Sequence, residues 1–182
     1  MQLFINMIKD LFQAFLSSRG TEGTTLPVEP TEPLDEAKNA LKSDEYIYWK
    51  KGELKHLSQH ILSSEVECRR CDLGSVQKIS KDLLNRFEQV RTDFGHPIRI
   101  TSAYRCSAHN KIIGGAKNSQ HIFGNALDIQ PQTFSSAAQL ERLFSSCEKY
   151  FSSIGDARKR SPSLPSNFVH VDTRSDKRRW IY

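Results

Sequence analysis

Residues 100–128 read ITSAYRCSAHNKIIGGAKNSQHIFGNALD, and this stretch decides how the chain is interpreted. His121 and Asp128 stand seven positions apart near its end, with Gly124 and Ala126 between them. Glycine tolerates a positive φ, and two small residues leave room for the chain to fold back on itself. We therefore expect His121 and Asp128 to be two ligands of one metal ion.

A second pattern far downstream supplies a candidate for the remaining ligand. Residues 168–172 read FVHVD, so His170 and Asp172 lie two positions apart on a predicted strand and point to one face. A catalytic zinc site usually has three protein ligands and one open position. His170 is expected to complete the site, with Asp172 orienting it or accepting a proton. The reverse assignment, with Asp172 as the ligand and His170 as its polar partner, fits the pattern as well.

Several motifs that occur in one order resemble a known peptidase family. They are Ser102-Ala-Tyr-Arg-Cys106, His109-Asn110, the glycine pair at 114–115, Ser-Gln-His at 119–121, Gly-x-Ala-x-Asp at 124–128, and the FVHVD segment. Together they resemble the zinc D,D-carboxypeptidases and L-Ala–D-Glu endopeptidases, in particular the small single-domain members of bacterial and phage genomes. The likeness covers about residues 60–182.

The resemblance implies both a fold and an activity. The fold is α+β, with a small antiparallel sheet flanked by helices, as in hedgehog-like peptidases. The activity is hydrolysis of peptide bonds in the stem peptides of peptidoglycan, with His121, Asp128 and His170 as the ligands of Zn²⁺. Arg105 would contact the substrate carbonyl or the developing oxyanion. The simpler alternative for Arg105 is a structural arginine that is bonded to nearby carbonyl groups.

The chain departs from this family at the general base. Many relatives carry Glu or Asp three residues before the last histidine ligand, where this chain has Asn167, whose side chain is not a base. Asp172 is the first candidate because it shares a strand face with His170, and Asp156 in the preceding loop is the second. The alternative to an enzyme is a catalytically inactive, metal-stabilised module that binds the cell wall or has a structural role.

Hydrophobic spacing predicts the scaffold around these residues. Helices are expected at 75–94, 107–113 and 135–151, strands at 97–103, 125–130, 168–173 and 177–182, and a polar loop at 155–166. Further helical pieces are expected at 35–46 and 53–62, and the second carries His56 and His60 on one face without a third ligand. The order lacks regular βαβ alternation, which favours an α+β fold.

The N-terminal part is expected to be separate from the peptidase domain. Residues 1–19 have apolar side chains at helical spacing, which predicts an amphipathic helix that docks on a protein partner. Polar residues interrupt this segment too early for a transmembrane segment, and it does not resemble a signal peptide. Residues 20–45 are expected to form a proline-rich linker and a short helix, and residues 46–182 the zinc peptidase domain.

The charge of the chain indicates its kind of partner, and its cysteine spacing indicates the state of its thiols. The chain has a formal net charge of +5, and residues 156–182 contain seven Lys or Arg against three Asp, which favours an anionic partner such as a wall polymer. Nucleic-acid binding is not expected, because only Trp180 and Tyr182 are interleaved with these charges. Cys68 and Cys71 form a C-x-x-C pair without a second such pair, so we expect packed thiols or one local disulfide and no structural zinc.

Overall fold

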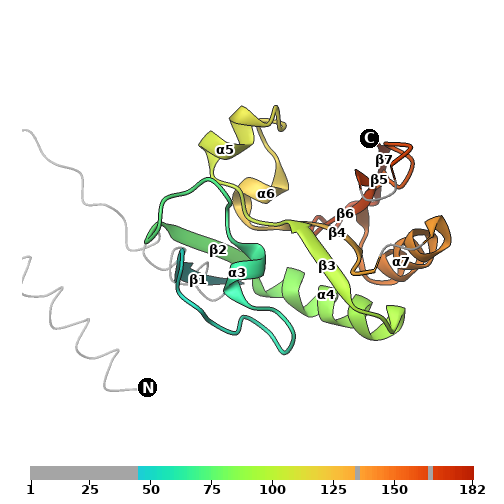
Figure 1. The fold of residues 1–182 in the computed structure, drawn as a ribbon, viewed down its shortest axis with the longest axis horizontal. Helices are drawn as coiled ribbons and strands as arrows, with labels where there is room; N and C mark the ends of the chain where they lie inside the picture. Colours follow the sequence, from blue (N-terminus) through green and yellow to red (C-terminus); the bar gives the residue numbers. More distant parts are fainter. Residues whose placement is uncertain (1–44, 134–135, 164–165) are drawn as a thin grey trace, which may run out of the picture. The chain divides into compact units, whose positions relative to one another are not determined.

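The computed structural model describes residues 45–133, 136–163 and 166–182 (Figure 1). The helix expected at 1–19 and the linker expected at 20–45 lie outside the described residues, except for the last position of the linker. The described part combines two sheets with several helices, which is the predicted α+β class. None of its helices is long and apolar enough to cross a membrane.

A five-stranded sheet carries the site. Its strands lie in the order β3 (Ile98–Ser102), β4 (Ala126–Pro131), β6 (Phe168–Asp172), β5 (Ser153–Ala157) and β7 (Arg178–Ile181). Three of the four pairings are antiparallel, whereas β7 runs parallel to β5. The prediction of a loop at 155–166 is wrong over its first residues, because residues 155–157 belong to β5. Pairing with a strand on each side outweighs the polar, glycine-containing sequence of this segment.

Two long helices cover one face of this sheet. Helices α4 (Lys81–Phe94) and α7 (Ala137–Tyr150) pack against each other, and α7 also packs on β4 and β6 (Figure 1). Their buried apolar side chains share one core with Leu127, Ile129, Val169 and Val171 of the sheet. Because side chains alternate along a strand, Asp128 and His170 point to the opposite face, away from this core.

The helix predicted at 75–94 is wrong over its first residues. Val76–Ser80 form strand β2, which pairs antiparallel with β1 (Tyr46–Lys50) in a separate two-stranded sheet. The apolar residues of this segment also fit a helical period, but pairing with β1 decides the conformation. Ser80 instead caps α4, with its Oγ accepting from the N–H of Leu83, and Gly95 ends the helix as predicted.

The helical piece predicted at 53–62 is also wrong. Within the described chain these residues form bends and an isolated bridge between His56 and Leu62, and a short helix, α3 (Ser63–Val66), follows them. His56 and His60 therefore do not share a helix face. His60 Nδ1 lies 2.7 Å from Glu88 Oε2 instead.

The stretch that carries the motifs folds through two short helices. Helix α5 (Ser107–Ile112) matches the prediction, whereas α6 (Gln120–Phe123) was not predicted. Gly124 ends α6 with φ of 75°, and a Cβ at this position would lie 2.6 Å from the carbonyl oxygen of Lys78. The glycine is therefore needed because the chain passes close to the backbone of β2 at the end of α6, the helix that carries His121.

Candidate metal centre

The structure brings the side chains of His121, Asp128 and His170 together. His121 Nε2 lies 3.2 Å from Asp128 Oδ1 and 3.2 Å from His170 Nδ1, and His170 Nδ1 lies 2.8 Å from Asp128 Oδ1. Asp128 and His170 are cross-strand partners on β4 and β6, while His121 comes from α6. All three residues are buried. Three donor atoms from three separate segments thus converge on one point.

The hydrogen bonds around His121 fix which ring nitrogen faces this point. His121 Nδ1 lies 2.7 Å from the carbonyl oxygen of Ala103. A carbonyl oxygen accepts hydrogen bonds and donates none, so Nδ1 must carry the proton. In the neutral ring, Nε2 is then unprotonated and presents its lone pair to Asp128 and His170.

His170 presents its other nitrogen to the same point. Its Nε2 lies 3.3 Å from Asp172 Oδ2, and a proton on Nε2 that is donated to this carboxylate leaves Nδ1 of the neutral ring free for a metal. Asp172 is fully buried and also accepts from Ser153 Oγ at 2.9 Å and from Arg174 Nη2 at 2.6 Å. Burial alone would raise the pKa of Asp172, but the bonds from Arg174 and His170 outweigh burial and hold the pKa well below its usual range.

The donor set fits a zinc ion. Two imidazole nitrogens and one carboxylate oxygen face one another, and these are ligand types that zinc binds in catalytic sites. Tetrahedral zinc with bonds of about 2.0–2.1 Å would hold its ligand atoms about 3.4 Å apart, close to the distances between these three atoms. Burial alone would raise the pKa of Asp128, but His121 and His170 outweigh burial and hold the pKa well below its usual range. The carboxylate is therefore ionised and able to bind a metal.

The comparison with known families agrees with this geometry. The model of the family described as Peptidase M15 matches residues 55–172, which is more than half of the chain. The chain belongs to the peptidase M15 family. This is a family of zinc-dependent metallopeptidases related to D-Ala–D-Ala carboxypeptidases, and the matched region includes all three converging residues. A search among curated proteins gave no match.

Arg105 of this M15 peptidase lies beside the cluster of His121, Asp128 and His170. Its Nη2 donates to Asp128 Oδ2 at 3.0 Å, and its Nε donates to Ser102 Oγ at 2.9 Å. Asp128 therefore keeps Oδ1 for the metal while Oδ2 is held by the guanidinium. Arg105 also lines the cleft described below, so its predicted contact with substrate stays a prediction.

The two predicted bases occupy different places. Asp172 contacts His170, but His170, Ser153 and Arg174 surround its carboxylate, and it does not line the cleft. The structure does not bring Asp156 to the cluster. Asp156 pairs with Val169, so it points to the helix-covered face of the sheet, where Arg158 binds both of its oxygens. The residue at the position of the family's base is also turned away, because the Asn167 amide bonds to the backbone of Ser161.

A large and strongly cationic cleft opens over the cluster. It has a volume of about 1140 Å³, and its lining includes His121, Asp128 and His170. Asp128 is the one carboxylate among the described residues that line it. The cationic residues of the lining are Arg69, Arg105, Arg160, Arg174, Lys177, Arg178 and Arg179. This excess of positive charge attracts anionic ligands.

Two aromatic residues at the C-terminal end form a wall of the cleft that sequence reasoning did not place there. The rings of Trp180 and Tyr182 lie 5.2 Å and 6.3 Å from the ring of His170. Gly155, which pairs with both His170 and Trp180, makes room for them, because a Cβ at this position would lie 2.6 Å from each aromatic side chain. The alternation of the predicted strand at 177–182 puts Trp180 and Tyr182 on one face, and this pattern could have identified them as a pair.

Proposed function

We propose that this M15 peptidase is a zinc-dependent enzyme that hydrolyses peptide bonds in peptidoglycan stem peptides. The observation that carries the proposal is the convergence of three donor atoms, on His121, Asp128 and His170, at the wall of a cationic cleft. When bound there, zinc supplies a Lewis acid that polarises the scissile carbonyl and lowers the pKa of a water molecule.

The charge of the cleft supports a stem peptide as the substrate. Stem peptides carry free carboxylates along the chain and at the C-terminus, and Arg is the side chain best suited to bind carboxylates with two parallel hydrogen bonds. Arg178 and Arg179 lie next to the aromatic wall on β7, and Arg69 lines the cleft from the loop before β2. A substrate with several carboxylates would thus meet more than one arginine within the cleft.

The ligands are held by two neighbouring residues with different roles. Arg105 binds the outer oxygen of Asp128 and is proposed to contact the substrate carbonyl as well. Asp172 is proposed as a positioning residue that keeps Nδ1 of His170 directed at the metal, because its carboxylate is occupied and lies outside the cleft. This replaces the general-base role that the sequence favoured for Asp172.

One observation favours a second candidate, a metal-stabilised module that binds the cell wall without cleaving it. Asn167 replaces the acidic residue of many relatives, and among the described residues Asp128 is the one carboxylate that lines the cleft. A hydrolase needs a group that accepts a proton from the attacking water, and a ligand carboxylate paired with Arg105 is a poor acceptor.

Mass spectrometry of digested muropeptides separates the candidates. Purified peptidoglycan is incubated with the zinc-loaded wild-type protein, with His121→Ala, and with His56→Ala as a control histidine outside the cleft. We expect products with the wild type and the control and none with His121→Ala. Release of terminal D-Ala identifies a D,D-carboxypeptidase, and a cut between L-Ala and D-Glu identifies an endopeptidase. Stoichiometric zinc without any product would support the binding module.

The N-terminal part is proposed to place the enzyme rather than to take part in catalysis. In this proposal residues 1–19 dock on a protein partner and residues 20–45 act as a tether, as would suit a phage-encoded lytic enzyme bound to a virion or released at lysis. A chain beginning at Tyr46 should cleave soluble muropeptides as fast as the full chain. A loss of zinc and activity in the shorter chain would contradict the domain boundary.

A further inference from the structure

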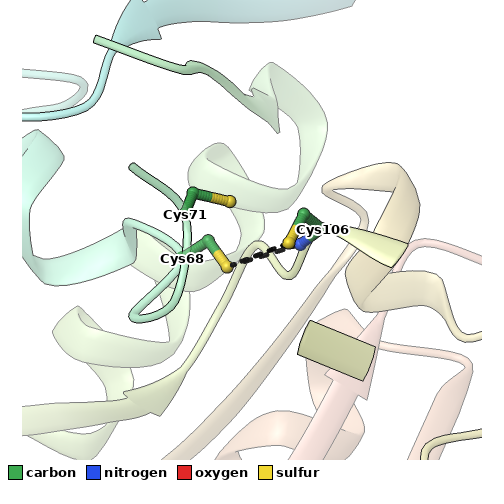
Figure 2. Close-up of side chains that lie close together, drawn as sticks. All are labelled: Cys68, Cys71 and Cys106. Carbon is green, nitrogen blue, oxygen red and sulfur yellow. Dashed lines mark hydrogen bonds between the residues drawn. The ribbon is translucent and has the colours of Figure 1, made fainter. Parts of the chain in front are cut away.

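A second group of metal-binding side chains lies apart from the His121, Asp128 and His170 cluster. The sulfur atoms of Cys68, Cys71 and Cys106 all lie within 4.8 Å of one another, and all three thiols are free. Figure 2 shows the side chains of Cys68 and Cys71 leaving one loop toward that of Cys106 across from them. The expectation of packed thiols or a disulfide between Cys68 and Cys71 therefore missed a third cysteine, which comes from a segment 35 positions further along.

The distances within this group match metal coordination and not a disulfide. The Sγ atoms of Cys68 and Cys106 are 3.8 Å apart, whereas a disulfide holds its sulfur atoms about 2 Å apart. A tetrahedral zinc ion with Zn–S bonds of about 2.3 Å separates its sulfur ligands by about 3.8 Å. The observed separation thus equals the edge of a zinc–thiolate tetrahedron.

His109 lies beside the three cysteines and offers a fourth donor atom. Its Nδ1 lies 3.3 Å from Cys68 Sγ, close to the nitrogen–sulfur separation of about 3.6 Å that tetrahedral zinc requires. Cys106 and His109 are three positions apart at the start of α5, as Cys68 and Cys71 are in their loop. The missing second C-x-x-C is thus replaced by C-x-x-H, which gives two ligand pairs with the spacing of structural zinc sites.

The backbone around the sulfur atoms is arranged to receive negative charge. The N–H of Cys106 donates to Cys68 Sγ at 3.4 Å, and the N–H of His109 donates to Cys106 Sγ at 3.4 Å. Cys68 is fully buried, so thiolates gathered here would repel one another without a cation between them. From the convergence of three cysteine sulfurs, with the imidazole of His109 beside Cys68, we propose that Cys68, Cys71, Cys106 and His109 bind a structural zinc ion.

This zinc ion would brace one side of the cleft. Arg69 lies between the first two ligands and lines the cleft, with its Nη2 donating to the carbonyl oxygen of Thr101 at 2.7 Å. Arg105, which holds Asp128, directly precedes the ligand Cys106. The ion would therefore tie the loop with Arg69 to the start of α5, next to Arg105, and would do so without taking part in hydrolysis.

Metal content and cobalt spectroscopy of the full chain test the proposal. We expect the reduced wild-type protein to bind two zinc ions and the cobalt-substituted protein to show thiolate-to-cobalt charge-transfer absorption. His121→Ala should bind one zinc ion and keep this absorption, because the other site has no sulfur ligand. Cys71→Ser should lose the absorption, whereas Cys147→Ser, which changes a cysteine outside the cluster, should keep it.

The wild-type protein alone decides the question if a cysteine variant fails to fold. A single zinc ion per chain with no thiolate-to-cobalt absorption would overturn the proposal, and so would a Cys68–Cys106 disulfide in the native protein. None of these measurements depends on the hydrolysis of a substrate. A failure of the proposed peptidase activity would therefore leave this test unaffected.

Discussion

Replacing Asp172 with asparagine tests whether this residue positions His170 or acts as a base. The two carboxylate oxygens accept from Ser153 Oγ, from His170 Nε2, and from the backbone and side chain of Arg174. An amide keeps one oxygen, so at least two donors lose their acceptor in Asp172→Asn. At about 1–2 kcal/mol for each, the free energy of unfolding should fall by about 2–4 kcal/mol. The orientation of His170 should also loosen, and zinc affinity should fall about 10–100-fold.

Zinc affinity is measured by competition with a chromophoric chelator, and stability by chemical denaturation. Ser153→Ala is the matched control, since it removes one hydrogen bond to Asp172 without touching His170. It should cost about 1 kcal/mol of stability and leave zinc affinity unchanged. The reasoning is refuted if Asp172→Asn binds zinc as tightly as the wild type while hydrolysis falls about 10²–10⁴-fold, because that is the behaviour of a general base.

Three further predictions concern the scaffold. Gly124→Ala should destabilise the fold by more than 2 kcal/mol in denaturant titrations, about twice the loss for Gly114→Ala, because both have positive φ but only Gly124 would press a Cβ against β2. Burial alone would raise the pKa of Glu88, but bonds from Ser58 and His60 outweigh burial and lower it. Its stabilising effect is therefore present above the unfolded pKa of about 4.3 and lost as pH falls through the lower folded value. Glu88→Gln should therefore flatten the curve of stability against pH below about pH 5. Chelation of zinc should lower the melting temperature, measured by calorimetry, by about 2–4 °C for each kcal/mol of zinc-binding free energy that is lost. Adding zinc back should restore the melting temperature.

Much of the candidate site was predictable because its residues lie on regular elements. The spacing of His170 and Asp172 on a strand predicts that both point to one face, and Asp172 does contact His170. The strand that carries Asp128 was predicted as well, and its antiparallel pairing with β6 makes Asp128 the cross-strand partner of His170. Local periodicity was sufficient here because each strand has one apolar and one polar face.

Features that depend on pairing between distant segments were not predictable. Val76 and Ile79 fit the period of the following helix, and only the partner strand at 46–50 makes them part of a strand. The sequence around Asp156 predicts a loop, but β6 and β7 pair with this segment on either side and make it strand β5. This pairing directs the Asp156 side chain away from the candidate metal centre. Cys106 joins Cys68 through tertiary structure alone, so the cysteine spacing by itself did not reveal the cluster.

Anomalous X-ray scattering from crystals of the zinc-loaded protein tests the central claim most directly. The account predicts a zinc peak about 2.0–2.2 Å from His121 Nε2, Asp128 Oδ1 and His170 Nδ1, with Nε2 of His170 still directed at Asp172. No zinc peak among these three atoms, or a His170 ring turned so that Nε2 binds the metal, would contradict it.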